Sequence, residues 1–265
     1  MRRHSLPAEV YALVDATPGA VLLEGTSVEG AGLDGTGLAG TGECSGFSTR
    51  LFVAPSRILV AHQPDEIPAL FRAIESAVAA GRYAAGFFAY ECGQAFEPKA
   101  HMRTGKGGLV PTELAWLGIY DRAYVFDHAT GQFLGGDPPG LQADLAELRP
   151  RISASDGAEN SAPIPSDFAL TESEYARRIA QIHEWIRAGD IYQLNFTGPL
   201  HLATSLSAAA LYARLRMRQP AAYGAFLHLQ SGRRILSFSP ELFFHLESGA
   251  ATRRIVTRPM KGTAP

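Results

Sequence analysis

The feature of this sequence that most constrains its fold is a series of four short apolar segments near the C-terminal end. They cover residues 223–230, 234–238, 242–246 and 251–257, and residues that favour turns separate them. Short apolar segments bounded by Gly, Pro and Ser are typical of β-strands. Because connections of so few residues join antiparallel neighbours, we expect a largely antiparallel sheet here.

Two segments with helical periodicity stand between the predicted strands. Residues 66–83 repeat apolar side chains at helical spacing and end at Gly81. A second helix is predicted from Thr171 to Gly189: Thr171 and Glu174 fit a capping box, and Gly189 can adopt the left-handed conformation that ends a helix.

Further predicted elements complete the fold class. A third helix is expected over residues 206–218, closed by Pro220. Additional strands are expected over residues 84–90, 113–120, 122–128, 132–134 and 191–201. This mixture predicts an α+β fold with largely antiparallel sheets flanked by helices.

The chain is expected to contain two regions joined by a linker. Residues 151–168 are rich in Ser, Ala, Pro, Asp and Asn and show no periodicity, so they predict a linker or long loop. Residues 1–150 then form an N-terminal α+β region, and residues 169–265 form a second region.

Composition excludes several functional classes. The 265 residues are 46% hydrophobic and carry a formal net charge of −2, so the basic surface of a nucleic-acid-binding protein is not expected. Cys44 and Cys92 form no CxxC pair, which argues against a disulfide scaffold or a zinc site and fits a reducing cytoplasm. No apolar run has the length of a membrane span. We expect a cytoplasmic protein that binds neither nucleic acid nor membrane.

Two glycine-rich segments match phosphate-binding motifs only in part. Residues 35–40 fit the spacing of a dinucleotide fingerprint, but the residues that follow are poor helix formers. Residues 104–108 lack the first glycine of a phosphate loop, and Gly107 replaces its hydroxyl residue. We expect neither segment to bind a nucleotide.

The strongest candidates for chemistry are one acid and one amine near the C-terminal end. Glu241 follows an apolar run and Ser-Phe-Ser-Pro, and Lys261 lies twenty residues later beside Gly262. A lone carboxyl and a lone amine, each with apolar or cationic neighbours, can form a pair of general acid and nucleophile. A solvated surface lysine is the alternative interpretation.

Three segments resemble the chorismate-utilising enzymes, specifically those of the aminodeoxychorismate synthase component I type. They are similar to the segments GDIYQVN, S-x-SPE and TRPIKGT of that family, in the same order. In this sequence they are Gly189-Asp-Ile-Tyr-Gln-Leu-Asn195, Ser237-Phe-Ser-Pro-Glu241 and Thr257-Arg-Pro-Met-Lys-Gly-Thr263. Weaker similarity extends back to about Leu51. The resemblance implies a β-sandwich with outer helices.

The resemblance also implies a reaction. Lys261 would attack C2 of chorismate while Glu241 gives a proton to the C4 hydroxyl that leaves, and ammonia would then add at C4. Gly262 and Thr263 would bind substrate. A glutamine amidotransferase partner would supply the ammonia, for para-aminobenzoate and folate synthesis. Mg²⁺ would be a cofactor, with ligands in a segment that family members carry beyond the lysine; we expect no metal ligands within this chain.

An effector pocket is a further implication. Members of the family bind tryptophan near an L-L-E-S segment and an N-P-x-P-Y segment. In this sequence, residues 22–25 and residues 219–223 match these segments only loosely. Tyr223 and Gly224 are the effector residues that the resemblance suggests. Cys92 is expected to be a buried structural thiol.

Other functions remain open at this point. Anthranilate synthases carry alanine where this chain has Lys261, so an anthranilate synthase or an isochorismate synthase relative is the alternative enzyme. A non-catalytic fragment or partner-binding module is the alternative of another class, and we expect these 265 residues alone to be inactive. A two-residue hairpin at 248–249 would place Glu241 opposite Val256, up to roughly 16 Å along an extended chain from Lys261.

Overall fold

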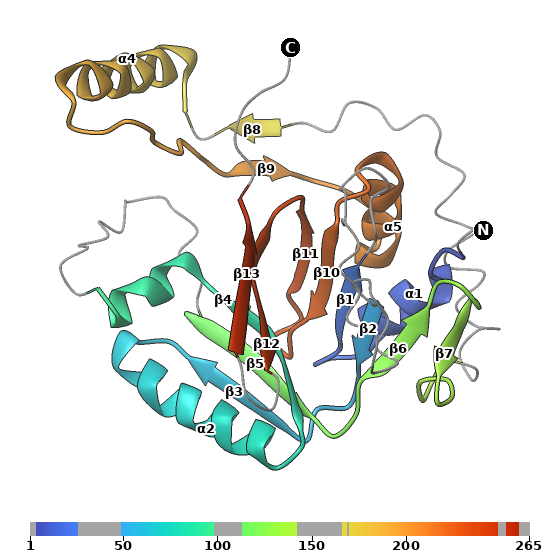
Figure 1. Ribbon diagram of the computed structural model, residues 1–265. Helices are drawn as coiled ribbons and strands as arrows, with labels where there is room; N and C mark the ends of the chain where they lie inside the picture. The colour runs from blue at the N-terminus through green and yellow to red at the C-terminus, as the bar shows by residue number, and fades with distance from the viewer. Residues whose placement is uncertain are drawn as a thin grey trace. The chain divides into compact units, whose positions relative to one another are not determined.

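The computed structural model describes residues 4–25, 49–97, 113–141, 166–168, 170–248 and 253–259, and Figure 1 shows its elements. The helices and 3-10 turns are α1 (Ala8–Ala16), η1 (Pro64–Glu66), α2 (Ile67–Ala79), η2 (Tyr90–Ala95), α4 (Glu172–Ala188) and α5 (Ala208–Arg218). The strands are β1 (Val21–Gly25), β2 (Thr49–Phe52), β3 (Arg57–Ala61), β4 (Tyr83–Phe88), β5 (Ala115–Tyr120), β6 (Tyr124–Asp127), β7 (Gln132–Leu134), β8 (Ser166–Phe168), β9 (Leu200–Leu202), β10 (Tyr223–His228), β11 (Arg234–Ser239), β12 (Leu242–Ser248) and β13 (Arg253–Arg258).

The predicted helix signals are confirmed. The hydroxyl of Thr171 accepts a hydrogen bond from the Glu174 amide at 3.2 Å, and α4 ends at Gly189, whose φ is 80°. The carboxylate of Glu174 pairs with Arg178 at 2.6 Å, so the described contacts show the hydroxyl half of the capping box. Helix α2 likewise ends before Gly81, whose φ is 78°. Both helices therefore stop where a residue without a Cβ permits the left-handed turn.

One predicted strand is largely absent. The strand predicted over residues 191–201 is reduced to β9, and residues 191–199 are irregular. Asn195 and the Gly198–Pro199 pair explain this difference, since amide side chains compete for backbone hydrogen bonds and proline has no N–H to donate. The end of the predicted linker forms β8, which pairs with β9 through backbone groups and needs no apolar pattern.

The chain forms two compact units. The larger one comprises Met1–His101, Thr112–Gly157 and Leu206–Pro265, and the smaller one comprises Met102–Pro111 and Ala158–Ser205. In the larger unit β10 pairs with β1, so residues from both sides of the predicted linker share one sheet. In the smaller unit β8 pairs with β9, and the ring of Tyr175 on α4 lies 5.7 Å from that of Phe196.

The larger unit contains a sandwich of two antiparallel sheets. The first has the strand order β11-β10-β1-β2-β6-β7 and the second β3-β5-β4. Successive side chains of a strand point to opposite faces, so each sheet can bury both. On the first sheet Leu22 and Phe226 pack against α1 and α5, whereas Val21 and Leu227 pack against Trp116 of β5.

Helix α2 covers the other face of the second sheet. Leu117 and Ile119 of β5 pack with Ile67 and Leu70 of α2, and Figure 1 shows α2 lying along β3. The layers of this unit are therefore helices, sheet, sheet and helix. This arrangement confirms the predicted α+β class with antiparallel sheets and outer helices. Among the described helices, none combines the length and the apolar character that crossing a membrane requires.

Candidate functional site

The acid singled out in the sequence lies at a bend between two pairs of strands. Strand β11 pairs with β10 up to Ser239, which lies opposite Tyr223. Strand β12 starts at Leu242 and pairs with β13. Pro240 and Glu241 connect the two, and the side chain of Glu241 is exposed. The bend thus presents the carboxyl of Glu241 to solvent at the end of a strand.

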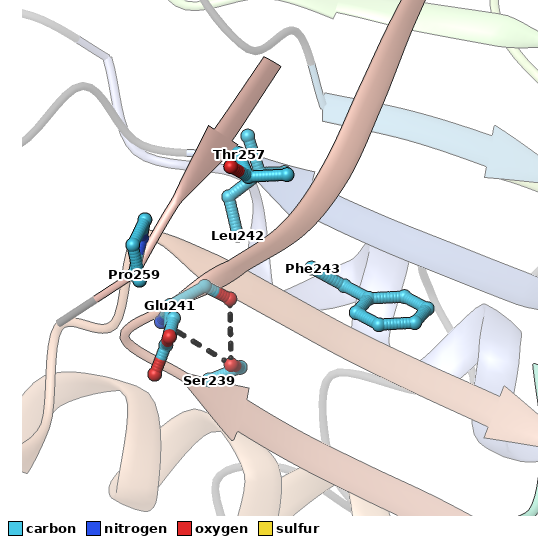
Figure 2. Close-up of a pocket in the computed structure, with 6 residues that line it drawn as sticks. All are labelled: Ser239, Glu241, Leu242, Phe243, Thr257 and Pro259. Carbon is cyan, nitrogen blue, oxygen red and sulfur yellow. Dashed lines mark hydrogen bonds between the residues drawn. The ribbon is translucent and has the colours of Figure 1, made fainter. Parts of the chain in front are cut away.

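The side chain of Ser239 forms two hydrogen bonds with the backbone of Glu241, across this bend. The hydroxyl of Ser239 donates to the carbonyl oxygen of Glu241 at 2.9 Å and accepts from the Glu241 amide at 3.3 Å. Figure 2 shows both bonds. Pro240 cannot donate a backbone hydrogen bond here because its nitrogen carries no proton. The serine hydroxyl therefore connects β11 directly to the backbone of Glu241.

A pocket of about 280 Å³ lies at this bend. Its lining comes from β11, the bend, the paired strands β12 and β13, and the residue after β13: Ser239, Glu241, Leu242, Phe243, Thr257 and Pro259. Three of these side chains carry oxygen and three are apolar. The pocket therefore combines a carboxyl and two hydroxyl groups with a partly apolar wall, which suits a small ligand with an apolar ring and polar substituents.

The β12–β13 register corrects the geometry expected from the sequence. Ser248 lies opposite Arg253, so four residues connect the strands where a two-residue turn was expected. His245, and not Glu241, lies opposite Val256, and Leu242 lies opposite Arg258 after a register shift. The longer connection and the shift bring the start of β12 beside the end of β13. Glu241 and Pro259 are the next residues on each side, and both line the pocket.

The other predicted catalytic and substrate-binding residues fall outside the described part of the chain. These are Lys261, Gly262 and Thr263. Their roles remain predictions. The glycine-rich segments at 35–40 and 104–108 also lie outside the described residues.

The two segments suggested for an effector pocket meet where β1 pairs with the start of β10. Glu24 of β1 lies opposite Gly224 of β10, and Gly25 lies opposite Tyr223. A Cβ at Gly224 would lie 2.7 Å from the hydroxyl oxygen of Tyr212, which is too close for any side chain. The hydroxyl of Tyr212 thus occupies the space beside Gly224. An effector role for Tyr223 and Gly224 stays a prediction.

Beside these strands lies a buried ionic cluster that the sequence did not reveal. Glu24 accepts hydrogen bonds from Tyr11 at 3.3 Å and from Tyr212 at 3.1 Å, and it pairs with Arg216 at 3.2 Å. Burial, reinforced by the charge of Glu24, raises the pKa of both tyrosines, so they remain neutral donors. Arg216 also donates to the carbonyl oxygen of Ala221.

Arg216 lies in the last turn of α5, where cations interact favourably with the helix dipole. Its partner Glu24 is far away in the sequence, so no local pattern could identify the pair. In the sequence, Ser239 and Thr257 stand out only as members of the segments that resemble the family. The signal that could have singled out Ser239 is the Ser-Pro pair, which favours a turn, because serine hydroxyls at turns often bond to nearby backbone groups.

The described residues contain no group of three His, Cys, Asp or Glu side chains that could hold a metal ion. The described residues therefore provide no set of ligands for the Mg²⁺ that the resemblance implies. Cys92 is buried, as expected, and burial raises the pKa of its thiol. A thiol in such surroundings is a poor nucleophile.

Comparison with known proteins gives a consistent result. Aminodeoxychorismate synthase component 1 of Salmonella typhimurium is 32% identical over 186 residues, which cover 69% of this chain and 38% of that protein. Anthranilate synthase component 1 of Streptomyces coelicolor is 31% identical over 201 residues, covering 68% and 38%. The chain thus spans well under half the length of these curated relatives.

The fold and the family also match. The crystal structure of anthranilate synthase component I from Streptococcus pneumoniae superposes with a TM-score of 0.56 at 15% identity, covering 82% of this chain and 55% of that one. This similarity supports the sandwich with outer helices. A family model described as chorismate binding enzyme matches residues 41–265, which is most of the sequence. The chain therefore belongs to the chorismate binding enzyme family.

Proposed function

We propose that the protein carrying this chain aminates chorismate at C4 to give 4-amino-4-deoxychorismate. The observation that carries the proposal is the β12–β13 register. Leu242 lies opposite Arg258, and Glu241 and Pro259 line one pocket. Lys261 follows Pro259 by two residues, so in any conformation its Cα lies within about 7 Å of the Pro259 Cα. The short covalent connection from Pro259 therefore limits how far the amine of Lys261 can lie from the pocket that Glu241 lines.

Each group has a defined role in this reaction. The neutral amine of Lys261 attacks C2 of chorismate, and the electron pairs of the two conjugated ring double bonds shift so that the C4 hydroxyl leaves. Glu241 gives that hydroxyl a proton, and water departs. Ammonia then adds at C4 and loses a proton to solvent, both ring double bonds return to their original positions, and the lysine amine leaves C2. The exposed position of Glu241 allows it to regain a proton between turnovers.

The choice of C4 rests on Lys261. The relatives include both aminodeoxychorismate synthases and anthranilate synthases at similar identity, so overall similarity does not separate the two activities. Anthranilate synthases carry alanine at this position, and alanine cannot act as a nucleophile. Amination at C2, giving anthranilate, is the second candidate, favoured by the Streptomyces coelicolor relative.

The ammonia source, the cofactor and the location are parts of the same proposal. A glutamine amidotransferase partner would provide ammonia, as the words "component 1" in the relatives' names suggest. Mg²⁺ would be held by residues beyond the lysine segment, as the resemblance implies; the described residues contain no group of three His, Cys, Asp or Glu side chains for it. The few separated cysteines fit a cytoplasmic location.

The proposal is tested on the natural protein that contains this chain. It is incubated with chorismate, ammonium and Mg²⁺, and the product is identified by chromatography and mass spectrometry. We expect aminodeoxychorismate; formation of anthranilate would contradict amination at C4.

Two substitutions test the assigned roles. Lys261→Ala should abolish product formation, whereas Lys106→Ala, in a glycine-rich segment elsewhere, should leave it unchanged. Glu241→Gln should lower kcat by about 100-fold or more, as expected for loss of a general acid. With ammonia omitted, the wild-type protein should gain the mass of chorismate minus water, and Lys261→Ala should not. Full activity of Lys261→Ala would refute the covalent role.

A further inference from the structure

The bend that carries Glu241 lies between two strand ladders. The ladder of β10 and β11 ends at Tyr223 and Ser239. The ladder of β12 and β13 begins at Leu242 and Arg258. Ladder hydrogen bonds fix the backbone within each pair of strands, whereas Pro240, as a proline, has no N–H to donate. The direction of the Glu241 side chain thus depends on whatever fixes the backbone at this point.

The hydroxyl of Ser239 supplies such a constraint. It accepts the N–H of Glu241 and donates to the carbonyl oxygen of the same residue, so both polar groups of the Glu241 backbone bind one side chain. Ser239 is half-buried at the end of a paired strand, whereas Glu241 is exposed. Ser239, held by the paired strand, therefore restrains the backbone of the exposed Glu241. Both residues line the pocket.

We infer that Ser239 is a positioning residue for Glu241: its hydroxyl holds the backbone of Glu241 so that the carboxyl is directed at the ligand in the pocket. This inference rests on the proposed role of Glu241 as proton donor. Ser239 itself transfers no proton to substrate, because its own proton is engaged with the Glu241 carbonyl. Proton transfer requires donor and acceptor within hydrogen-bond reach, so a rotated backbone at Glu241 would lower kcat more than it raises KM.

A cycle of variants in the natural protein distinguishes positioning from a structural role. Ser239→Ala should lower kcat roughly 3- to 10-fold, the loss expected for one net hydrogen bond, while KM stays within about twofold. Ser239→Thr keeps the hydroxyl and should restore kcat. In the Glu241→Gln background, Ser239→Ala should lower kcat no further, since the group it positions is gone. Equal losses in both backgrounds, or no loss in either, would overturn the inference.

The hydrogen bond itself can be tested without turnover. Hydrogen exchange of the Glu241 amide, followed by NMR, should be roughly 3- to 10-fold faster in Ser239→Ala and close to wild type in Ser239→Thr. Ser237→Ala is the matched control, because it removes a hydroxyl from the same face of β11 two residues earlier and should not change this exchange. If Ser239→Ala does not fold, Ser239→Cys, a much weaker hydrogen-bonding group of similar size, takes its place.

The two measurements separate the failure of this inference from that of the proposed function. Anthranilate as product would refute C4 amination, yet the exchange result and the variant cycle, measured on anthranilate, would still test Ser239. Unchanged exchange of the Glu241 amide in Ser239→Ala would refute the positioning role even if the protein makes aminodeoxychorismate.

Discussion

At the scale of single residues, the larger unit contains buried polar groups that form hydrogen bonds and an ion pair with one another. Glu24 and Arg216 are 5% and 8% exposed, and two tyrosine hydroxyls complete the shell of the carboxylate. A buried charge without a partner is far more costly than a paired one. These residues are therefore sensitive to substitution although none of them lines the candidate pocket.

Glu24→Gln tests this cluster. It leaves the charge of Arg216 without its buried partner, so the free energy of unfolding should fall by about 3–5 kcal/mol, measured by urea denaturation. Glu75→Gln, an exposed position on α2, is the control and should change stability by no more than about 0.5 kcal/mol. A change below about 1 kcal/mol in Glu24→Gln would show that the buried pair contributes little.

His228 gives a pH-dependent prediction. It is 4% exposed, and its Nδ1 lies 3.1 Å from the Val14 carbonyl oxygen. Burial, with the nearby charge of Arg234, lowers its pKa, against smaller opposing effects of the hydrogen bond to Val14 and of Asp15. Because the unfolded chain binds a proton at pH values where the folded chain does not, His228 costs stability as pH falls below about 6.5, and nothing above it.

His228→Asn keeps a donor near the position of Nδ1 but does not titrate. Urea denaturation between pH 8 and pH 5 should therefore show a smaller loss of stability in this variant than in the wild type. His201→Asn, at an exposed position, should follow the wild type. Parallel curves for His228→Asn and the wild type would contradict the assignment.

At the scale of elements, local signals define where helices begin and end. Thr171 caps α4 with a bond to the Glu174 amide, and Gly189 takes the left-handed conformation. These signals act over three or four residues, so they can be read directly from the sequence. The prediction of a strand over 191–201 was wrong because a strand, unlike a helix, needs a partner distant in the sequence for its backbone hydrogen bonds. With Pro199 and its polar neighbours, only β9 is paired.

Thr171→Ala should loosen the first turn of α4 by about 1 kcal/mol. We expect trypsin to cleave after Arg177 or Arg178 roughly five times faster in this variant, as local opening becomes easier. Mass spectrometry of timed samples identifies the site. Thr171→Ser keeps the cap and should be cleaved at nearly the wild-type rate; equal rates for all three proteins would refute the capping role.

At the scale of the whole molecule, the two sheets of the larger unit share a core. Trp116 of β5 is 2% exposed and packs with Val21 of β1 and Leu227 of β10. The hydroxyl of Tyr120 donates to the Gly19 carbonyl oxygen at 2.7 Å, joining the second sheet to the segment before β1. Residues distant in sequence therefore stabilise one sandwich.

Trp116→Ala should lower the free energy of unfolding by about 3–5 kcal/mol, because it removes a large buried side chain between the sheets. Trp185→Ala, at a position 41% exposed on α4, is the control and should cost much less. Urea denaturation measures both. A similar small loss in the two variants would show that the sheets do not depend on Trp116.

The sequence by itself determined the helices α2, α4 and α5, the strands β10 to β13, the helix ends at Gly81 and Gly189, and the family segments. Each of these depends on residues close together in the chain. It could not determine the register of β12 and β13, because register depends on the length of the connection and on the shift between Leu242 and His245. Only the tertiary structure placed Glu241 beside Pro259, tied its backbone to Ser239 and paired Glu24 with Arg216. These contacts form when strands pair and side chains are buried together, and no local pattern encodes that outcome.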